Sequence, residues 1–387
     1  MLEKKLIELE SAGEKLTEQW LQDEIKRCIN QIEKNMGRFE ELFPSASAVD
    51  GVYKVKPNDD WTNGFWTGML WLAYEWTNDS KFLDLAQKNF ISFQERLDSH
   101  FVLDHHDIGF LYSLSAGAGY KLTNEEKYAD QLLEASNVLL NRFQAKGEFI
   151  QAWGKYGDPN EYRLIIDSLI NLPLLFEATN LSNNSLYQDL ALKHYKTLLS
   201  TVIRPDFTTY HTYYFDSETG DKIRGATHQG NSDNSIWARG QSWAVLGIPL
   251  IENHLKSKIY SSSDYIKIVN VFLENLPLDL VPYWDFDFND QNPSTKDSSS
   301  LAIAACGLLE AEEYGMYPKA KNIAKGMIYQ LGEYYSTENE ESSEGLITEG
   351  VYAFKTGKGV GEPNLWGDYF YLEALMRLSN EKWNKYW

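Results

Sequence analysis

Two aspartates in apolar runs could act together as an acid and a base. Asp107 opens the apolar run in HHDIGFLYSL, and Asp167 interrupts YRLIIDSLINLPLLF; both runs are long enough to form core helices. Burying an ionised carboxylate in such surroundings destabilises the fold unless a cation pairs with it or the group becomes protonated. A carboxylate kept there without either is a candidate for a function. Because both aspartates occupy the same point of a recurring segment, we predict that they face one cavity as a catalytic pair.

Each aspartate also has a structural interpretation. Asp107 precedes an apolar helix, where a carboxylate can accept hydrogen bonds from free backbone N–H groups, so capping and catalysis explain it equally well. Asp167 follows two isoleucines and precedes a leucine-rich run, a setting that raises the pKa of a carboxyl group and suits a general acid. The local pattern therefore favours catalysis more strongly at Asp167.

The cluster formed by Asp104, His105, His106 and Asp107 could suggest a metal site. Adjacent residues do not all point at one ion in an ordinary loop, so no metal is predicted there. The sequence lacks HExxH, GxSxG and GxxxxGK[ST], which removes the usual support for zinc proteolysis, serine hydrolysis and P-loop chemistry. The segment KTGKGVG (355–361) lacks the P-loop spacing and is predicted to be a flexible cationic loop.

A second group of candidates combines aromatic faces with polar and cationic tips. Such a combination suits the binding of an anionic sugar. Any one member has a structural explanation as well, since a buried histidine bonded to a carbonyl is commoner than a catalytic one. The candidates are Trp61, His211, His228, Gln229, Trp237, Arg239 and Trp243, with Arg163 and Lys358 as further cations.

The composition argues against several classes of function. The 387 residues include 36 Lys and Arg against 56 Asp and Glu, a formal net charge of −20 that opposes nucleic-acid binding. No stretch approaches the roughly 20 apolar residues that span a bilayer, and the charged start does not read as a signal peptide. We therefore predict a soluble, cytoplasmic protein without a membrane partner. Cys28 and Cys306 lack CxxC spacing and are predicted to be buried free thiols.

Six apolar segments recur along the chain and predict buried helices. Amphipathic stretches alternate with them and predict half-exposed helices. The apolar segments are 62–76, 106–120, 166–179, 238–251, 296–310 and 367–378, and the clearest amphipathic stretches are 81–97, 127–143 and 186–203.

This alternation predicts an all-α fold, in which an inner ring of helices is wrapped by an outer ring. Six helix pairs make an α6/α6 barrel, and the first residues of the inner helices would surround one funnel. We predict that residues 1–387 form a single catalytic domain, with residues 1–50 as an N-terminal helical segment packed on it. Residues 210–237 are expected to form a β-hairpin or extended lid at the funnel.

Six strings of the chain recur in order in one known family: DHHDIGFLY, EFIQAWG, YRLIIDSL, HTYYFDSETG, WARGQSWAVLGIPL and GKGVGEPNLWGDYFYLEAL. They resemble the unsaturated glucuronyl hydrolases, family 88 of the glycoside hydrolases, and most closely the streptococcal type. The resemblance runs from about Trp61 to the C-terminus. It implies an α6/α6 barrel without metal or organic cofactor, which removes the 4,5-unsaturated uronic acid that lyases leave on chondroitin or hyaluronan disaccharides.

The resemblance also implies roles for individual residues. Asp167 matches the general acid and base, and Asp107 the second essential aspartate. His211 and Gln229 match residues near the reacting carbons and water. The pocket for the unsaturated sugar is matched by Trp61, Trp237, Arg239 and Trp243, with Arg239 predicted to bind the uronate carboxylate. Tyr352 is placed beside the leaving sugar, and Ala353, Thr356 and Lys358 fall where a Ser, Ser and Lys set meets a sulfate.

Other functions compete with this interpretation. A polysaccharide lyase on a similar toroid needs a base and a group that neutralises the carboxylate of an intact uronate. His211 and Tyr213 keep this alternative open. A noncatalytic sugar-binding toroid and an unsaturated rhamnogalacturonyl hydrolase of the same fold are further alternatives. The sequence predicts neither the oligomeric state nor a choice between chondroitin, hyaluronan and heparin fragments.

Overall fold

The computed structural model describes residues 2–340, 342–380 and 382–387. The chain divides into two compact units. Unit 1 comprises Met1–Lys56, Gln229–Asn231 and Ser235–Trp383, and unit 2 comprises Pro57–His228, Ser232–Asn234 and Asn384–Trp387. The prediction that residues 1–387 form a single domain stays a prediction.

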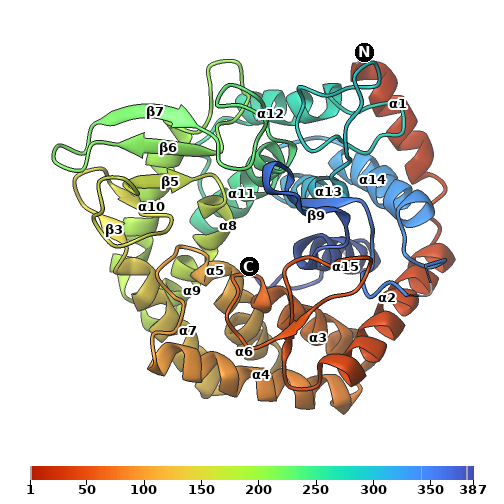
Figure 1. The fold of residues 1–387 in the computed structure, drawn as a ribbon, viewed down its shortest axis with the longest axis horizontal. Helices are drawn as coiled ribbons and strands as arrows, with labels where there is room; N and C mark the ends of the chain where they lie inside the picture. The colour runs from red at the N-terminus through yellow and green to blue at the C-terminus, as the bar shows by residue number, and fades with distance from the viewer. Residues whose placement is uncertain (1, 341, 381) are drawn as a thin grey trace. The chain divides into compact units, whose positions relative to one another are not determined.

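Unit 2 contains nine helical segments and five short strands among its described residues (Figure 1). The helices are α3 (Asn63–Thr77), α4 (Ser80–Asp98), α5 (Ile108–Tyr112), η1 (Ser113–Gly117, a π-helix), α6 (Ala118–Thr123), α7 (Glu126–Leu140), α8 (Ser168–Asn171), α9 (Pro173–Ser182) and α10 (Ser185–Leu199). The strands are β3 (Phe143–Gln144), β4 (Phe149–Ile150), β5 (Arg163–Ile165), β6 (Thr212–Phe215) and β7 (Lys222–Ala226).

Unit 1 is also mainly helical where it is described. Its helices are α1 (Leu2–Gly13), α2 (Glu18–Phe39), α11 (Ala238–Leu255), α12 (Ser262–Glu274), α13 (Ser298–Glu313), α14 (Ala320–Tyr334) and α15 (Leu365–Ser379), with a short 3₁₀ helix η2 (Phe354–Thr356). Its strands are β1 (Phe43–Pro44), β2 (Val55–Lys56), β8 (Gly350–Ala353) and β9 (Lys358–Glu362).

The predicted alternation of buried and amphipathic helices is present in both units. Helix α3 is buried from Asn63 to Ala73, and α11, α13 and α15 are buried over most of their lengths. Each of these helices packs against a half-exposed one, in the pairs α3 with α4, α11 with α12, α13 with α14 and α15 with α2. Apolar residues on all sides bury the first helix of a pair, while a single apolar stripe leaves the second half-exposed.

Two of the predicted buried helices are interrupted. In 106–120, α5 passes into the π-helix η1, where the Ser115 hydroxyl donates to the Leu111 carbonyl at 2.7 Å. In 166–179, α8 ends before Pro173, which begins α9. Proline has no N–H to continue the hydrogen bonds of α8, so the apolar run forms two helices.

The loops contain more sheet structure than predicted. The hairpin expected in 210–237 is confirmed as β6 and β7, which continue β5 in a three-stranded antiparallel sheet (Figure 1). The prediction of a flexible loop at 355–361 is wrong, because β8, η2 and β9 form a second antiparallel hairpin there. Gly357, Gly359 and Gly361 all have positive φ, which allows the tight turn and the irregular strand pairing that follows it.

Two further predictions can be compared with the structure. Cys28 and Cys306 are buried free thiols, as predicted. Among the described residues, no helix is long and apolar enough to cross a membrane.

Candidate active site

Asp107 and Asp167 directly precede two short helices, but neither side chain caps its helix. Asp107 stands at the N-cap of α5 and Asp167 at the N-cap of α8, and neither makes a side-chain capping hydrogen bond. By contrast, the Asp79 carboxylate at the start of α4 accepts from the backbone N–H of Lys81 at 3.1 Å. Both site aspartates are half-buried. Capping, the structural alternative for Asp107, therefore does not account for its carboxylate.

Residues of α8 join the starts of the two helices. The Asn171 side chain accepts a hydrogen bond from the Phe110 backbone N–H at 2.8 Å and donates one to the Asp167 backbone oxygen at 3.1 Å. The Ser168 hydroxyl lies 2.9 Å from Nδ1 of His106. Asp107 follows His106 and Asp167 precedes Ser168, so these contacts place the two aspartates at adjoining helix starts.

Asp107 is held as an anion. Burial alone would raise the pKa of its carboxyl group, but contacts with His106 and His105 outweigh burial and hold the pKa well below its usual range. Nε2 of His106 lies 3.2 Å from one carboxylate oxygen, and Nδ1 of His105 lies 3.5 Å from the other. An anion that stays ionised cannot be the proton donor, so Asp107 suits a stabilising role.

The close approach of α5 and α8 requires a glycine. A Cβ on Gly109 would lie 2.4 Å from the Asn171 Cα and 2.5 Å from the Asn171 backbone oxygen. These are backbone atoms that cannot move aside without separating the helices.

We therefore expect Gly109→Ala to destabilise the protein by about 1–3 kcal/mol and to reduce activity, because it pushes the two aspartates apart. Gly117→Ala is the matched control, since its Cβ would meet nothing closer than 3.5 Å. Denaturant unfolding and activity of both variants test this. Equal stability of the two variants would show that the helices are not in tight contact.

His211 lies beside this pair through the sheet. Its backbone oxygen accepts from the N–H of Ile166, the residue before Asp167, at 2.9 Å. Its Nδ1 accepts from the backbone N–H of His228 at 2.9 Å, which leaves Nε2 to carry the proton of the neutral ring. His211 is thus a buried donor next to the segment that carries Asp167.

Trp61 precedes α3 and contacts the helix that Asp107 begins. Its ring centroid is 5.5 Å from that of Phe110 in α5 and 6.0 Å from that of Phe65. Trp61 is half-buried, and an aromatic ring at such a position suits stacking against a sugar.

Arg239 organises a second group of candidates, in unit 1. One guanidinium nitrogen donates to the Asp297 carboxylate at 2.8 Å and to the Val351 backbone oxygen. The other donates at 3.0 Å to both the Gln229 side-chain oxygen and the Tyr352 backbone oxygen. The guanidinium also lies 4.5 Å from the Trp237 ring centroid and 4.9 Å from that of Trp366.

These contacts bear on the predicted role of Arg239. Its side chain is 3% exposed, and its charge is balanced by the fully buried Asp297. Arg239 therefore orients Gln229 and the β8 hairpin in this structure, and direct binding of a uronate carboxylate stays a prediction.

The remaining candidates of unit 1 differ in exposure. Trp243 is 1% exposed and packs on Phe370 at 5.6 Å between ring centroids, which fits a core residue. Tyr352 is half-buried, and the Lys358 ammonium lies 3.9 Å from its ring centroid. Thr356 is exposed at the hairpin turn, where its hydroxyl donates to the Ala353 oxygen at 3.2 Å.

Trp153 pairs with His105 in an isolated β-bridge and had no role assigned from the sequence, whereas Arg163 and His228 were candidates. The Trp153 ring lies 5.4 Å from His228, and the Arg163 guanidinium lies 4.3 Å from the Trp153 ring centroid. The Arg163 guanidinium also donates to Glu161 and Tyr214. The signal for Trp153 was its place in EFIQAWG, one of the strings that resemble family 88.

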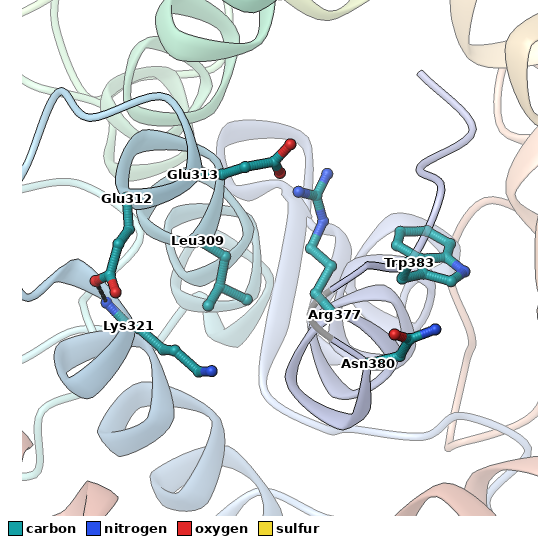
Figure 2. A pocket seen from close by; sticks show the side chains of 7 residues that line it. All are labelled: Leu309, Glu312, Glu313, Lys321, Arg377, Asn380 and Trp383. Atoms are coloured by element: carbon teal, nitrogen blue, oxygen red, sulfur yellow. Dashed lines mark hydrogen bonds between the residues drawn. The ribbon is translucent and has the colours of Figure 1, made fainter.

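A cavity of about 220 Å³ lies elsewhere in unit 1, where α13 and α15 end and α14 begins (Figure 2). Its lining residues are Leu309, Glu312, Glu313, Lys321, Arg377, Asn380 and Trp383, and none is a predicted site residue. Its arginine pairs with Glu310 and Glu373 at 2.8 Å each. The charge of this arginine is therefore balanced by protein carboxylates. Within the described ranges, no group of three or more His, Cys, Asp or Glu side chains is arranged to hold a metal ion.

Comparisons with known proteins agree with the predicted fold. A crystal structure of unsaturated glucuronyl hydrolase from Streptococcus agalactiae matches with a TM-score of 0.91 and 40% identity, over 96% of this chain and 94% of that one. A mutant of that enzyme complexed with dGlcA-GalNAc6S matches with a TM-score of 0.84 and 37% identity, over the same shares. These structures are α/α barrels, so the predicted fold class is confirmed.

Sequence comparison identifies the family. Residues 32–371 match Glycosyl Hydrolase Family 88. The unsaturated chondroitin disaccharide hydrolase of Streptococcus pneumoniae is 44% identical over 378 residues, which cover 96% of this chain and 95% of the relative. The fold and the match define a glycoside hydrolase of the α/α-barrel class. The chain belongs to Glycosyl Hydrolase Family 88, as its sequence motifs predicted.

Proposed function

We propose that this enzyme removes 4,5-unsaturated glucuronic acid from the non-reducing end of glycosaminoglycan disaccharides made by lyases. The observation that carries the proposal is the placement of Asp107 and Asp167 at adjoining helix starts, with Asp107 held as an anion. The name of the S. pneumoniae relative and the sugar in the S. agalactiae complex support this substrate class.

The chemistry needs one acid and one stabilising anion. The substrate contains an enol ether, C4=C5–O5, and protonation of C4 produces positive charge shared by C5 and the ring oxygen. Asp167 in its acid form delivers that proton, and as a carboxylate it then helps water add to C5. The resulting hemiketal opens and releases the next sugar. Asp107 offsets the positive charge as it develops and orients the sugar hydroxyls.

The other candidates bind and orient the substrate in this proposal. His211 and Gln229 act near the reacting carbons and water, and Trp61 offers a face for the sugar ring. Trp237 and Arg239 are assigned to binding of the unsaturated sugar and Tyr352 to contact with the leaving sugar, whereas Trp243, predicted with them, is a core residue of α11. Because the anomeric carbon is not attacked, the separation of the two carboxylates does not predict retention or inversion here.

One assay separates this function from its alternatives. The hydrolase consumes the conjugated alkene of an unsaturated chondroitin disaccharide, so ultraviolet absorbance falls during turnover. A lyase acting on intact chondroitin would raise the same absorbance. A binding protein would leave the absorbance of both the disaccharide and the polymer unchanged. A rise on the intact polymer, or no change on the disaccharide, would refute the proposal. Activity on unsaturated rhamnogalacturonyl substrates alone would identify the enzyme as an unsaturated rhamnogalacturonyl hydrolase.

The β8–β9 hairpin gives a prediction about sulfate. Where streptococcal-type relatives have Ser, Ser and Lys, this chain has Ala353, Thr356 and Lys358. The Thr356 hydroxyl donates to a backbone oxygen, and the Lys358 ammonium lies over the Tyr352 ring. We expect 6-sulfated disaccharides to be accepted through Lys358, but with a preference roughly tenfold weaker than a second hydroxyl donor would give.

Comparison of kcat/KM on sulfated and unsulfated disaccharides measures this preference. Ala353→Ser should restore a preference for the sulfated substrate, and Ser47→Ala, a change in the neighbouring segment that keeps the hairpin sequence, is the control. A strong preference of the native enzyme for the unsulfated disaccharide would contradict the prediction.

We also propose that unsaturated hyaluronan disaccharides are substrates, because they carry the same unsaturated uronic acid. A cytoplasmic location, with disaccharides imported before cleavage, completes the proposal. Kinetics on hyaluronan disaccharides and activity in cell fractions test these two points.

A further inference from the structure

We propose that Ser168 is a positioning residue whose hydroxyl keeps a proton on Nε2 of His106, so that this N–H holds the Asp107 carboxylate in place. The inference rests on the catalytic role proposed above for Asp107. One imidazole lies between the two groups: Nδ1 of His106 is hydrogen-bonded to the Ser168 hydroxyl at 2.9 Å, and Nε2 faces an Asp107 carboxylate oxygen at 3.2 Å in an electrostatic contact that is not aligned as a hydrogen bond.

A serine hydroxyl suits this position because it can both donate and accept. When His106 is neutral, Ser168 donates to Nδ1 and the ring proton stays on Nε2, facing the carboxylate. When His106 is protonated, Ser168 accepts from Nδ1–H and Nε2–H still faces Asp107. The other neutral tautomer would direct the lone pair of Nε2 at an anion, which is unfavourable.

Burial makes this arrangement specific. Ser168 and His106 are each 1% exposed. Without the hydroxyl, Nδ1 would lose a partner in a place that bulk water does not reach. The backbone also fixes the ring, because the His106 N–H donates to the Ala152 oxygen at 2.7 Å.

The other charged groups around Asp107 do not replace His106. Nδ1 of His105 accepts from the Asp107 backbone N–H at 3.1 Å, and its Nε2 lies 2.9 Å from the Val102 oxygen, so its one neutral-state proton is directed at that carbonyl. Arg96 of α4 and Arg142 after α7 attract Asp107 electrostatically, but the Arg96 guanidinium donates to four oxygen atoms other than the Asp107 carboxylate.

Buried His194 of α10 also belongs to this environment, since burial and then the charge of His106 lower its pKa to about 3, and two acids lie nearby. Asp167 precedes α8, and the exposed Asp104 interacts with His100 at 3.2 Å and with Arg142 at 3.9 Å. Neither acid can donate an N–H to Asp107. His106 therefore supplies the ring N–H that faces the Asp107 carboxylate.

Ser168→Ala tests the proposal. We expect kcat to fall about tenfold with little change in KM, because substrate binding is retained while the carboxylate loses its orientation. The acidic limb of the pH profile of kcat/KM should move to higher pH. Nitrogen NMR of ¹⁵N-histidine protein should change from Nε2-protonated His106 to a mixture of tautomers. Ser136→Ala removes an equally buried hydroxyl from α7, which donates to the Leu132 oxygen at 2.8 Å, and should change none of these readouts.

Two results would overturn the proposal. One is a Ser168→Ala enzyme with an unchanged tautomer and pH profile, because a purely structural role would lower activity without moving them. The other result comes from the native protein: an NMR spectrum that shows neutral His106 with its proton on Nδ1. If Asp107→Asn keeps full turnover, the proposed function of Asp107 fails, while the NMR result still decides the role of Ser168.

Discussion

Asp167→Asn is expected to lower kcat by about a thousandfold or more, because the amide can neither deliver a proton to C4 nor accept one from water. The fold should persist, since asparagine has nearly the same shape and the Asp167 side chain does not cap α8. The backbone oxygen that receives the Asn171 hydrogen bond is unaffected. Loss of alkene absorbance gives turnover, and circular dichroism with thermal unfolding gives the state of the fold.

Asp158→Asn is the matched control for this variant. Asp158 lies in the turn before β5 and accepts the Asn160 backbone N–H at 2.9 Å, a role that an asparagine oxygen can also fill. Its activity should equal that of the native enzyme. An Asp167→Asn enzyme that retains more than about a tenth of native kcat would rule out Asp167 as the proton donor.

The sequence predicted the helices because their signals are local. Unbroken apolar runs such as 62–76 correspond to helices that are buried on most sides, and the six runs recur with small residues that permit close packing. Even the breaks have local causes, since Pro173 divides 166–179. The hairpin at 355–361 was missed because its three glycines indicate flexibility as readily as a turn of defined geometry.

The site was predicted less completely because its contacts join distant parts of the chain. The Ser168 hydroxyl meets His106 from 62 positions away, and Arg239 meets the Val351 oxygen across 112 positions. Residue type suggested that Arg239 binds an anion, whereas its protein partners are visible only in the structure. The low pKa of Asp107 likewise depends on which way the His106 ring faces.

Asp107→Asn is expected to lower kcat by about a hundredfold or more while KM changes less. Asparagine keeps the size of the side chain but removes the charge that offsets the developing cation, and such electrostatic stabilisation acts mainly in the transition state. Asp104→Asn is the control, because it removes a negative charge three residues earlier from a side chain that is 78% exposed. It should leave kcat near the native value, since a charge in solvent is strongly screened.

The pH dependence of stability distinguishes the charge of Asp107 from its shape. Because folding lowers the pKa of Asp107, its ionised form stabilises the protein above the ordinary pKa of an aspartate, and this contribution disappears as the pH falls toward the folded-state pKa. Asp107→Asn should therefore unfold at a lower temperature than the native protein at neutral pH, with the difference shrinking in acid. If kcat falls but the two thermal unfolding curves stay separated equally at all pH values, the asparagine has disturbed packing around His106. The loss of activity could then not be assigned to the missing charge.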